Sequence, residues 1–600
     1  MGQFSTVESS LTLLRANSFG ILRRDSWQTL EDSPYPRASS RLSTLTDKYS
    51  LSPDPRSWGS DLSPDLVEND DALHNPDTQP QRQEDPKQLL LNKRGLINLG
   101  CLLTLLFMIL FLFIGYPVIM YSTHANNHLS GYNLGGINSS GQVPSMGNFG
   151  LIDFDTPQDA YYRYSHRDGS RMDLVFSDEF NADGRSFYPG DDPYWEASDL
   201  HYWATNNMEW YDPAAVTTSN GSLVITFSEK ETHNLHYEGG LISTWNKFCF
   251  TGGYFEAAVQ LPGLNNVAGM WPAIWTMGNL GRAGYGASLE GMWPYTYDAC
   301  DVGTAPNQTR NGLPYAATVD GDHAYNWALS YLPGQKLSRC TCDGEDHPGP
   351  KHPDGTFVGR SAPEIDMFEA QTGGDPLRGQ VSQSAQFAPF DRSYHWNNSI
   401  DNMVIADPSI SKLNNFVGNV VQQATSVVTD TLQRCYGLVE DCYSLYGFEV
   451  GPLSLLQPGI YSHLEVAKYK PGFDDAYITW ISEGQVSWTL NAGGVGPDPT
   501  VEISARPIPQ EPMYMIINLG MSKNFGDVDF THLVFPTYLK VDYVRVYQPA
   551  DAINVGCDPE DFPTASYIER YIEAYSNANM TSWRGDYGKA FPKNSFIETC

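Results

Sequence analysis

One uncharged apolar stretch constrains this chain more than any other feature. Residues 96–121, LINLGCLLTLLFMILFLFIGYPVIMY, contain no Asp, Glu, Lys or Arg over 26 positions. A helix of this length can cross the hydrocarbon core of a bilayer with some tilt. A cleaved signal peptide would lie at the N-terminus and would have a shorter apolar core. The stretch therefore predicts one transmembrane helix over residues 95–121.

Basic residues are distributed unequally around this stretch. Lys87, Lys93 and Arg94 precede it, and the next basic residue is Arg163. Because cytosolic flanks carry the excess of Lys and Arg, the predicted topology is single-pass type II. Residues 1–94 are rich in Ser, Pro, Asp and Gln without periodicity, which predicts a disordered cytosolic tail. The rest of the chain would lie in the lumen or outside the cell.

Cysteines and glycosylation signals agree with that orientation. Of nine cysteines, Cys101 lies in the apolar stretch and the other eight follow it. In an oxidising compartment these eight allow up to four disulfides, whose pairing stays open. The cysteine and histidine spacings do not match a zinc site, so we expect no metal and no cofactor. Asn-x-Ser/Thr signals occur on the predicted lumenal side, at Asn138, Asn220, Asn307, Asn397 and Asn579.

Short β-rich segments follow a Gly/Asn/Ser-rich stalk that we predict over residues 122–155. Examples are GSLVITFSE, GGYFEAAVQLPG, MYMIINLGM and LKVDYVRVYQ, separated by Gly, Pro, Asn and Asp. Several alternate apolar with polar residues, and no long amphipathic helical pattern interrupts them. The pattern predicts an all-β fold, either a sandwich or a jelly roll. A net charge of −33 makes nucleic acid an unexpected partner, because its phosphates would be repelled.

Three carboxylates lie close together in SAPEIDMFEA, residues 361–370. On a regular strand Glu364 and Asp366 share one face, whereas Glu369 points the other way. A β-bulge between Asp366 and Glu369 would bring all three to one face. Two glutamates about 13 Å apart along the backbone can lean toward the separation of about 5–5.5 Å found in retaining glycosidases. An acidic edge strand or a calcium-binding patch fits these residues as well.

Tryptophans are candidate substrate platforms, because flat rings stack on the apolar faces of sugars. The segment GMWPAIWTMG contains Trp271 and Trp275, about 90 residues before the carboxylates. Trp396 and Trp480 are further candidates, whereas Trp488 is better assigned to the core. For Trp271 and Trp275 a place in the core is an equal alternative.

Taken in order, several segments resemble glycoside hydrolase family sixteen. EIDMFE is similar to the family's Glu-x-Asp-x-x-Glu signature, FSDEFN to its first strand and VDYVRVYQ to its last. The resemblance covers residues 170–548. It implies a concanavalin-like β-jelly-roll sandwich, here with large loop insertions. It also implies a bulged strand with Glu364 as the nucleophile, Glu369 as the acid/base and Asp366 as an assisting carboxylate. Many relatives have a His in the adjoining strand, where this chain offers Gln383 and Gln386.

A closer resemblance, covering nearly the whole chain after residue 90, is to the fungal membrane proteins required for cell-wall β-1,6-glucan synthesis. It rests on WNKFCFTGGYFEAAVQLPG, EGMWPYTYDACDVGT, RPIPQEPMYMIINLGMS and a Cys-ended tail. We expect a glycoside hydrolase-like domain over residues 156–550, with insertions at about 279–360 and 405–450. A Cys-containing extension would follow over residues 551–600.

That resemblance implies a role in fungal wall β-glucan assembly, with β-glucan as the polysaccharide partner and protein partners in the wall-synthesis machinery. It implies residence in the ER, the Golgi or the plasma membrane. The three retained carboxylates favour a retaining β-glucan hydrolase or transglycosylase. The alternative is a non-catalytic glucan-binding scaffold that supports other synthases.

Overall fold

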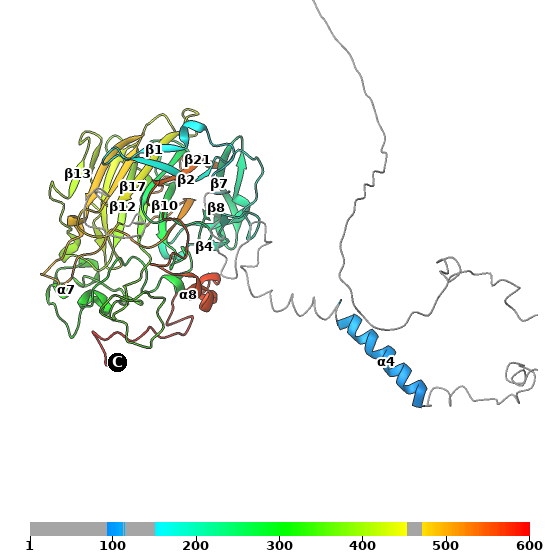
Figure 1. Cartoon of the computed structure of the whole chain (residues 1–600). Coiled ribbons are helices and arrows are strands. Elements are labelled where there is room, and N and C mark those ends of the chain that lie inside the picture. The colour runs from blue at the N-terminus through cyan, green and yellow to red at the C-terminus, as the bar shows by residue number, and fades with distance from the viewer. Residues whose placement is uncertain (1–92, 112, 114–149, 453–470) are drawn as a thin grey trace, which may run out of the picture. The chain divides into compact units, whose positions relative to one another are not determined.

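The computed structural model describes residues 93–111, 113, 150–452 and 471–600 (Figure 1). Most of the predicted tail and most of the predicted stalk, with Asn138, lie outside these residues. Helix α4 (Lys93–Leu110) covers the first part of the predicted membrane segment. Among the described residues, no helix is both long enough and apolar enough to span a bilayer. The transmembrane helix over 95–121 therefore stays a prediction.

One antiparallel sheet, called the cleft sheet here, carries the three carboxylates on β11 (Glu364–Gly373). β10 and β12 flank β11. The strands in spatial order are β3 (Glu196–Ala197), β8 (Leu235–Ser243), β20 (Met513–Gly520), β10 (Trp271–Gly278), β11, β12 (Arg378–Phe387) and β16 (Gln422–Asp430), with β14 (Ser411–Leu413) and β15 (Gly418–Asn419) beside β16.

A second antiparallel sheet, called the outer sheet here, has β21 (Thr537–Pro549) in its middle. β21 pairs with β9 on one side and with β2 and β7 on the other. The strands in spatial order are β1 (Tyr162–Tyr164), β2 (Arg171–Asp178), β21, β9 (Gly253–Gln260), β17 (Ser444–Gly451), β18 (Tyr477–Ser482), β19 (Gln485–Asn491) and β13 (Met403–Ile405).

A hairpin of β7 (Ser222–Thr232) and β8 joins the two sheets. β6 (Val216–Ser219) pairs with β7, which lies between β6 and β21. β4 (Leu200–His201) and β5 (Glu209–Tyr211) form a small ribbon, in which β5 runs parallel to β8. The ribbon brings Asn207 and Tyr211 to the cleft described below.

Bulky apolar side chains from both sheets fill the space between them. Ile365 and Phe368 of the cleft sheet belong to the same buried cluster as Phe255 and Phe448 of the outer sheet. Each fully buried side chain of this kind stabilises the fold by about 1.5–3 kcal/mol. The predicted all-β sandwich is thereby confirmed in its coarse form, two packed antiparallel sheets. The finer description, a jelly roll of concanavalin type, stays a prediction.

Buried hydrogen bonds also join the two sheets beneath the carboxylate strand. The indole of Trp480 on β18 donates to the main-chain oxygen of Asp366 at 2.8 Å. The side chain of Gln383 on β12 donates to the main-chain oxygen of Ile481 at 3.0 Å, and Trp488 donates to that of Gln383 at 3.2 Å. Satisfied buried polar groups of this kind favour one relative placement of the sheets.

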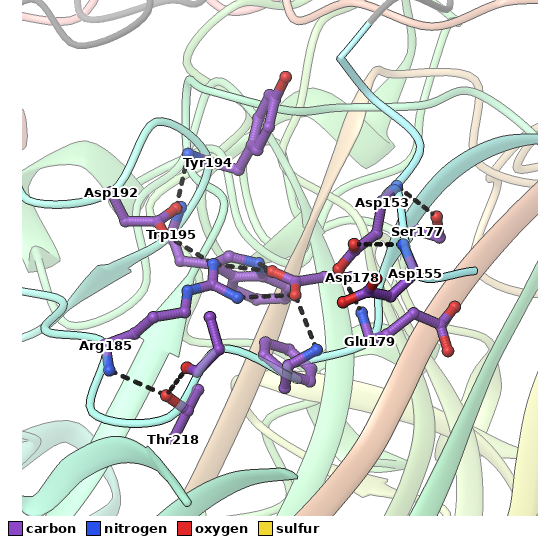
Figure 2. A network of polar contacts seen from close by, with 12 residues as sticks. Asp153, Asp155, Ser177, Asp178, Glu179, Arg185, Asp192, Tyr194, Trp195 and Thr218 are labelled. Carbon is purple, nitrogen blue, oxygen red and sulfur yellow. Dashed lines mark hydrogen bonds and ion pairs between the residues drawn. The ribbon is translucent and has the colours of Figure 1, made fainter. Parts of the chain in front are cut away.

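Figure 2 shows a polar network at the end of β2. Arg185 donates to both carboxylate oxygens of Asp178, at 2.7 and 2.9 Å, and to Asp192 at 2.7 Å. The indole of Trp195 donates to Asp178 at 2.9 Å. Paired and hydrogen-bonded in this way, the buried charges fix the segment 183–195 against the first long strand of the outer sheet.

Residues 279–360 connect β10 to β11 without adding a strand to either sheet. They contain the one-turn helices α6 (Gly286–Leu289) and α7 (Ala316–Val319). In the extension after residue 550, α8 (Ala565–Arg570) and α9 (Ile572–Ser576) form two short helices, and α9 packs against α6. The prediction of up to four disulfides is confirmed by Cys249–Cys557, Cys300–Cys340, Cys342–Cys600 and Cys435–Cys442.

Residues 405–450, which we predict to be an insertion, contribute the strands β16 and β17 to the two sheets. β16 pairs with β12 along eight residues of the cleft sheet. β17 pairs with β9 and β18 inside the outer sheet. Both strands fill central or near-central ladder positions, so this region is part of the sandwich. The disulfide Cys435–Cys442 closes the loop between them.

Candidate active site

The backbone of β11 is irregular where its carboxylates lie. The three-residue step from Asp366 to Glu369 spans only two residues of β12, which confirms the predicted bulge between them. Met367 and Phe368 are both buried in the core, not just one of them. The extra residue keeps Glu364, Asp366 and Glu369 on the opposite face, where all three line one cleft.

A neutral donor holds each of the three carboxyls. Charged partners would force ionisation, whereas neutral donors orient a carboxyl and favour its ionised form more weakly. The donors are Trp293 Nε1 to Glu364 Oε2 at 2.5 Å, Gln386 Nε2 to Asp366 Oδ2 at 3.1 Å, and Trp271 Nε1 to Glu369 Oε1 at 3.0 Å.

Burial and mutual repulsion raise the pKa values of all three carboxyls. Burial, and then the negative charge of Glu369, raises the pKa of Glu364 to about 8. Burial, and then the charge of Asp366, raises the pKa of Glu369 to about 8. Burial and the charge of Glu364 hold the pKa of Asp366 well above its usual range. The site therefore keeps a proton at neutral pH, which a general acid requires.

The cleft above these carboxyls has a volume of about 590 Å³. Its described lining contains no Lys, Arg or His, so it offers no cation for a phosphate or a carboxylate ligand. Amides and hydroxyls supply its polar groups, including Asn207, Ser384, Asn414 and Asn518. Such a lining suits an uncharged ligand rich in hydroxyl groups. Seven aromatic residues besides Tyr211 form much of the wall: Tyr202, Trp203, Trp271, Trp275, Trp293, Phe416 and Phe525.

A buried hydrogen-bond network fixes one part of the cleft floor. The indole of Trp275 donates to the side-chain oxygen of Asn518 at 2.8 Å. The amides of Asn518 and Asn207 both donate to the hydroxyl of Tyr211, at 3.2 and 3.1 Å. Asn207 also donates to the buried carboxyl of Glu209 at 2.7 Å. Burial raises the pKa of Glu209 to about 7. These bonds hold Trp275 and both asparagines in fixed orientations.

Of the four tryptophans predicted to bind substrate, Trp271 and Trp275 line the cleft. Trp271 also stacks on Phe525, with ring centroids 4.3 Å apart. Trp396 and Trp480 do not line it, and their placement corrects that part of the prediction. Both are buried in the main core, where Trp480 is 0% exposed and supports the carboxylate strand from below.

Sequence reasoning missed Trp293, Tyr202 and Phe525. Trp293 reaches Glu364 across 71 positions of sequence, from the segment that joins β10 to β11. The segment EGMWPYTYDACD, which contains Trp293, supports the family resemblance, but nothing in it indicates that Trp293 contacts Glu364. Tyr202 and Phe525 lie in loops, where no periodicity shows which way a side chain points. Gln386 faces the site, whereas Gln383 on the same strand is bound beneath it.

The four described sequon asparagines, Asn220, Asn307, Asn397 and Asn579, are all exposed. Exposure is what attachment of an N-linked glycan requires. These asparagines and Asn138 stay predicted glycosylation sites.

Comparison with known proteins gives the family. The family model "Beta-glucan synthesis-associated protein SKN1/KRE6/Sbg1" matches residues 60–600. The chain is 40% identical to beta-glucan synthesis-associated protein KRE6 of Saccharomyces cerevisiae, over 89% of this chain and 69% of that protein. It is 40% identical to beta-glucan synthesis-associated protein SKN1 of Candida albicans, over 89% of this chain and 67% of that protein.

Among solved structures, the endo-β-1,3-glucanase of Pyrococcus furiosus aligns over 66% of this chain and 98% of its own, at 16% identity and a TM-score of 0.34. By the match to the family model and to these two relatives, the chain belongs to the SKN1/KRE6/Sbg1 family of β-glucan synthesis-associated proteins.

Proposed function

We propose that the chain acts in β-glucan synthesis as a retaining glycosidase or transglycosylase. The main support is that one bulged strand presents three carboxyls to a cleft with aromatic walls. The described lining of that cleft contains no Lys, Arg or His. Glu364 is the nucleophile, Glu369 the acid/base and Asp366 the assisting carboxyl. The short hydrogen bond from Trp293 favours the ionised form of Glu364, the form in which a carboxyl acts as a nucleophile.

The reaction has two steps. Glu364 attacks the anomeric carbon of a glucosyl unit while Glu369 gives its proton to the departing glycosidic oxygen. The bond between carbon and that oxygen breaks, and an ester to Glu364 forms. Glu369, now ionised, takes a proton from water or from a sugar hydroxyl, whose oxygen attacks the same anomeric carbon. The bond between that carbon and the Glu364 oxygen breaks, and the Glu364 carboxylate is released. Water yields hydrolysis, and a sugar hydroxyl yields a new glycosidic bond.

Transfer serves synthesis better than hydrolysis, because it conserves the number of glycosidic bonds. The names of the yeast relatives support β-glucan as the polymer. We propose the β-1,6-glucan of the fungal wall as the glucan whose assembly depends on this chain. The protein partners would then be other members of the wall-synthesis machinery.

A non-catalytic glucan-binding scaffold is the second candidate. The raised pKa values of the three carboxyls favour it, because a nucleophile that keeps its proton up to about pH 8 attacks poorly. An aromatic cleft with fixed amides would still bind glucan. The experiment below separates the two functions.

We propose a type II membrane protein of the secretory pathway or plasma membrane, with the sandwich on the lumenal or outer side. Four disulfides support an oxidising compartment. The exposed sequon asparagines support the same side. Endoglycosidase treatment should shift the electrophoretic mobility of the full chain, and replacement of each Asn by Gln should remove one step of that shift.

Amide variants of the two glutamates test the catalytic proposal. Glu364→Gln and Glu369→Gln would be expressed as full chains in a fungal strain that lacks the native gene, with Glu231→Gln, an exposed residue of β7, as the matched control. We expect wall β-1,6-glucan to fall with both site variants and to be restored by the control. Normal glucan at wild-type protein abundance with Glu364→Gln would overturn catalysis.

The purified full chain separates the reaction types. Labelled β-1,3- and β-1,6-gluco-oligosaccharides would be incubated with it, and the products measured by mass spectrometry. Products longer than the substrate identify transfer, and only shorter ones identify hydrolysis. Tight binding without any product identifies the scaffold.

A further inference from the structure

The segment between β10 and β11 exposes large aromatic rings. Tyr325, Trp327 and Tyr331, called the outer aromatic cluster here, have exposed fractions of 45%, 50% and 47%. Tyr315, at the start of α7, is exposed as well. Rings of this size usually bury much of their surface in the core or in a contact with a partner. Four in one stretch of 17 residues mark a contact surface.

The backbone under the cluster is well anchored. The hydroxyl of Tyr331 donates to the main-chain oxygen of Tyr325 at 3.2 Å, and their ring centroids lie 5.7 Å apart. Leu329 is fully buried, and its main-chain oxygen accepts a hydrogen bond of 2.7 Å from the hydroxyl of Tyr394. Trp327 has a φ of 62°, in the left-handed region that bulky residues avoid. Its ring is thus held outward on a supported loop.

The cluster continues the wall of the candidate active site. The main-chain N–H of Tyr331 donates to the main-chain oxygen of Val420 at 2.8 Å. The next residue, Val421, lines the cleft together with Phe416, and both side chains are exposed. The cluster is therefore joined through the Tyr331–Val420 hydrogen bond to the segment that supplies Phe416 and Val421 to the cleft wall.

The charges beside the cluster do not favour an anionic ligand. Arg392, the nearby cation on the segment after β12, is paired with Asp320 at 2.8 Å. The carboxylate of Asp322 caps the turn before Tyr325 by accepting from the N–H of Ala324 at 2.8 Å. The ring of His323 packs edge-on against Trp327, with centroids 4.8 Å apart. The flat, uncharged rings of the cluster, two of which carry tyrosine hydroxyls, suit stacking on the apolar faces of sugar rings.

We propose that the outer aromatic cluster is a second binding site for a β-glucan chain, holding the part of the polymer that extends beyond the cleft. The proposal rests on the proposed function, because the polymer in the cleft and the polymer on the cluster are the same molecule. Two linked sites on one polymer increase its affinity without affecting ligands too short to reach both. The cluster would therefore distinguish long chains from short ones.

Binding of insoluble and short glucans tests this site. The parent is the full chain with Glu364→Gln and Glu369→Gln, which prevents turnover. The cluster variant adds Tyr325→Ala, Trp327→Ala and Tyr331→Ala. The matched control adds Tyr164→Ala, Tyr188→Ala and Tyr538→Ala, three exposed rings elsewhere. Trp327→Gly alone is a second variant, because Gly tolerates a positive φ and the fold should keep its stability.

We expect the cluster variant to bind particulate wall β-glucan at least tenfold more weakly than the parent, and the control to bind like the parent. Binding of a gluco-tetraose should be equal in all proteins. Polymer affinity of the cluster variant within twofold of the parent, with tetraose binding intact, overturns the second site and leaves the proposed function standing. If, in addition, a protein that crosslinks to the parent in cells no longer crosslinks to the cluster variant, the surface binds a protein partner instead of glucan. Absence of glucan binding by the parent overturns both proposals.

Discussion

Trp293 donates a hydrogen bond of 2.5 Å from its indole to Glu364, the proposed nucleophile. The donor comes from the connection between β10 and β11, and its ring packs against the cluster that contains Trp583 of the C-terminal extension. The group that acts on Glu364 is therefore held by a part of the chain outside the two sheets.

Replacement of Trp293 by Phe keeps a ring but removes this donor. Because the bond stabilises the carboxylate, its loss should raise the pKa of Glu364 further and leave less of it ionised at neutral pH. We expect kcat/KM to fall about tenfold at pH 7 and the acidic limb of its pH profile to move up by about one unit. Trp203→Phe, in the same cleft, should leave the limb in place. An unshifted limb in Trp293→Phe would show that the bond does not tune Glu364.

The raised pKa values also make stability depend on pH. Glu364 and Glu369 keep their protons up to about pH 8 when folded, whereas unfolded Glu ionises near 4.3. Between these values unfolding releases protons, so the folded state loses stability as pH rises. Glu364→Gln and Glu369→Gln should raise Tm by about 1–3 °C at pH 8 and leave it unchanged at pH 4. Equal Tm shifts at both pH values would contradict the raised pKa values; Glu231→Gln is the control.

Lys336 gives the opposite pH dependence. It is 1% exposed, its ammonium lies 3.7 Å from the centroid of the Trp583 ring, and burial lowers its pKa to about 7. Among the described residues its Nζ has no hydrogen-bond partner. Unfolded Lys stays protonated to about pH 10.4, so this group adds stability as pH rises above 7.

Lys336→Met should therefore stabilise the fold, and more at pH 6 than at pH 9. Thermal unfolding at the two pH values measures the difference. Lys351, an exposed lysine over the ring of Phe357, provides the matched control Lys351→Met, which should have little effect. A loss of stability at pH 6 in Lys336→Met would mean that the contact with Trp583 outweighs the cost of burial.

The disulfide Cys342–Cys600 ties the extension to the connection that carries Trp293. It joins cysteines 258 positions apart, whereas Cys435–Cys442 joins cysteines 7 apart. A cross-link over a long loop removes more entropy from the unfolded chain. Replacing both cysteines of the long pair by Ser should cost about 2–4 kcal/mol of unfolding free energy in urea. The same change in the short pair should cost less, and equal costs would argue against loop entropy as the cause.

The strand with the carboxylates could be predicted from sequence because its information is local. Side chains alternate between the two faces of a strand, so Glu364 and Asp366 share one face. One extra residue in the bulge brings Glu369 to the same face. The contacts of Trp293 could not be predicted, since nothing local records a partner 71 positions away.

The error on Trp480 has a physical cause. Trp480 carries a large ring that serves equally well in a core or a cleft, and only the pairing of β17, β18 and β19 decides its face. Residues 422–430, QQATSVVTD, contain the β-branched residues typical of a strand, and they form β16.

β21 is among the last elements of the chain, yet it occupies the middle of the outer sheet. Until residue 549 has been synthesised, β2, β7 and β9 each lack a neighbour and present open edges. Contacts between residues this distant in sequence form slowly. Until they form, the unpaired strand edges favour aggregation. The nascent domain thus cannot complete its sheets in the order of synthesis and would need chaperone protection until β21 arrives. A truncation before Pro549 removes part of the central strand of a sheet, so a piece able to fold must reach at least that residue.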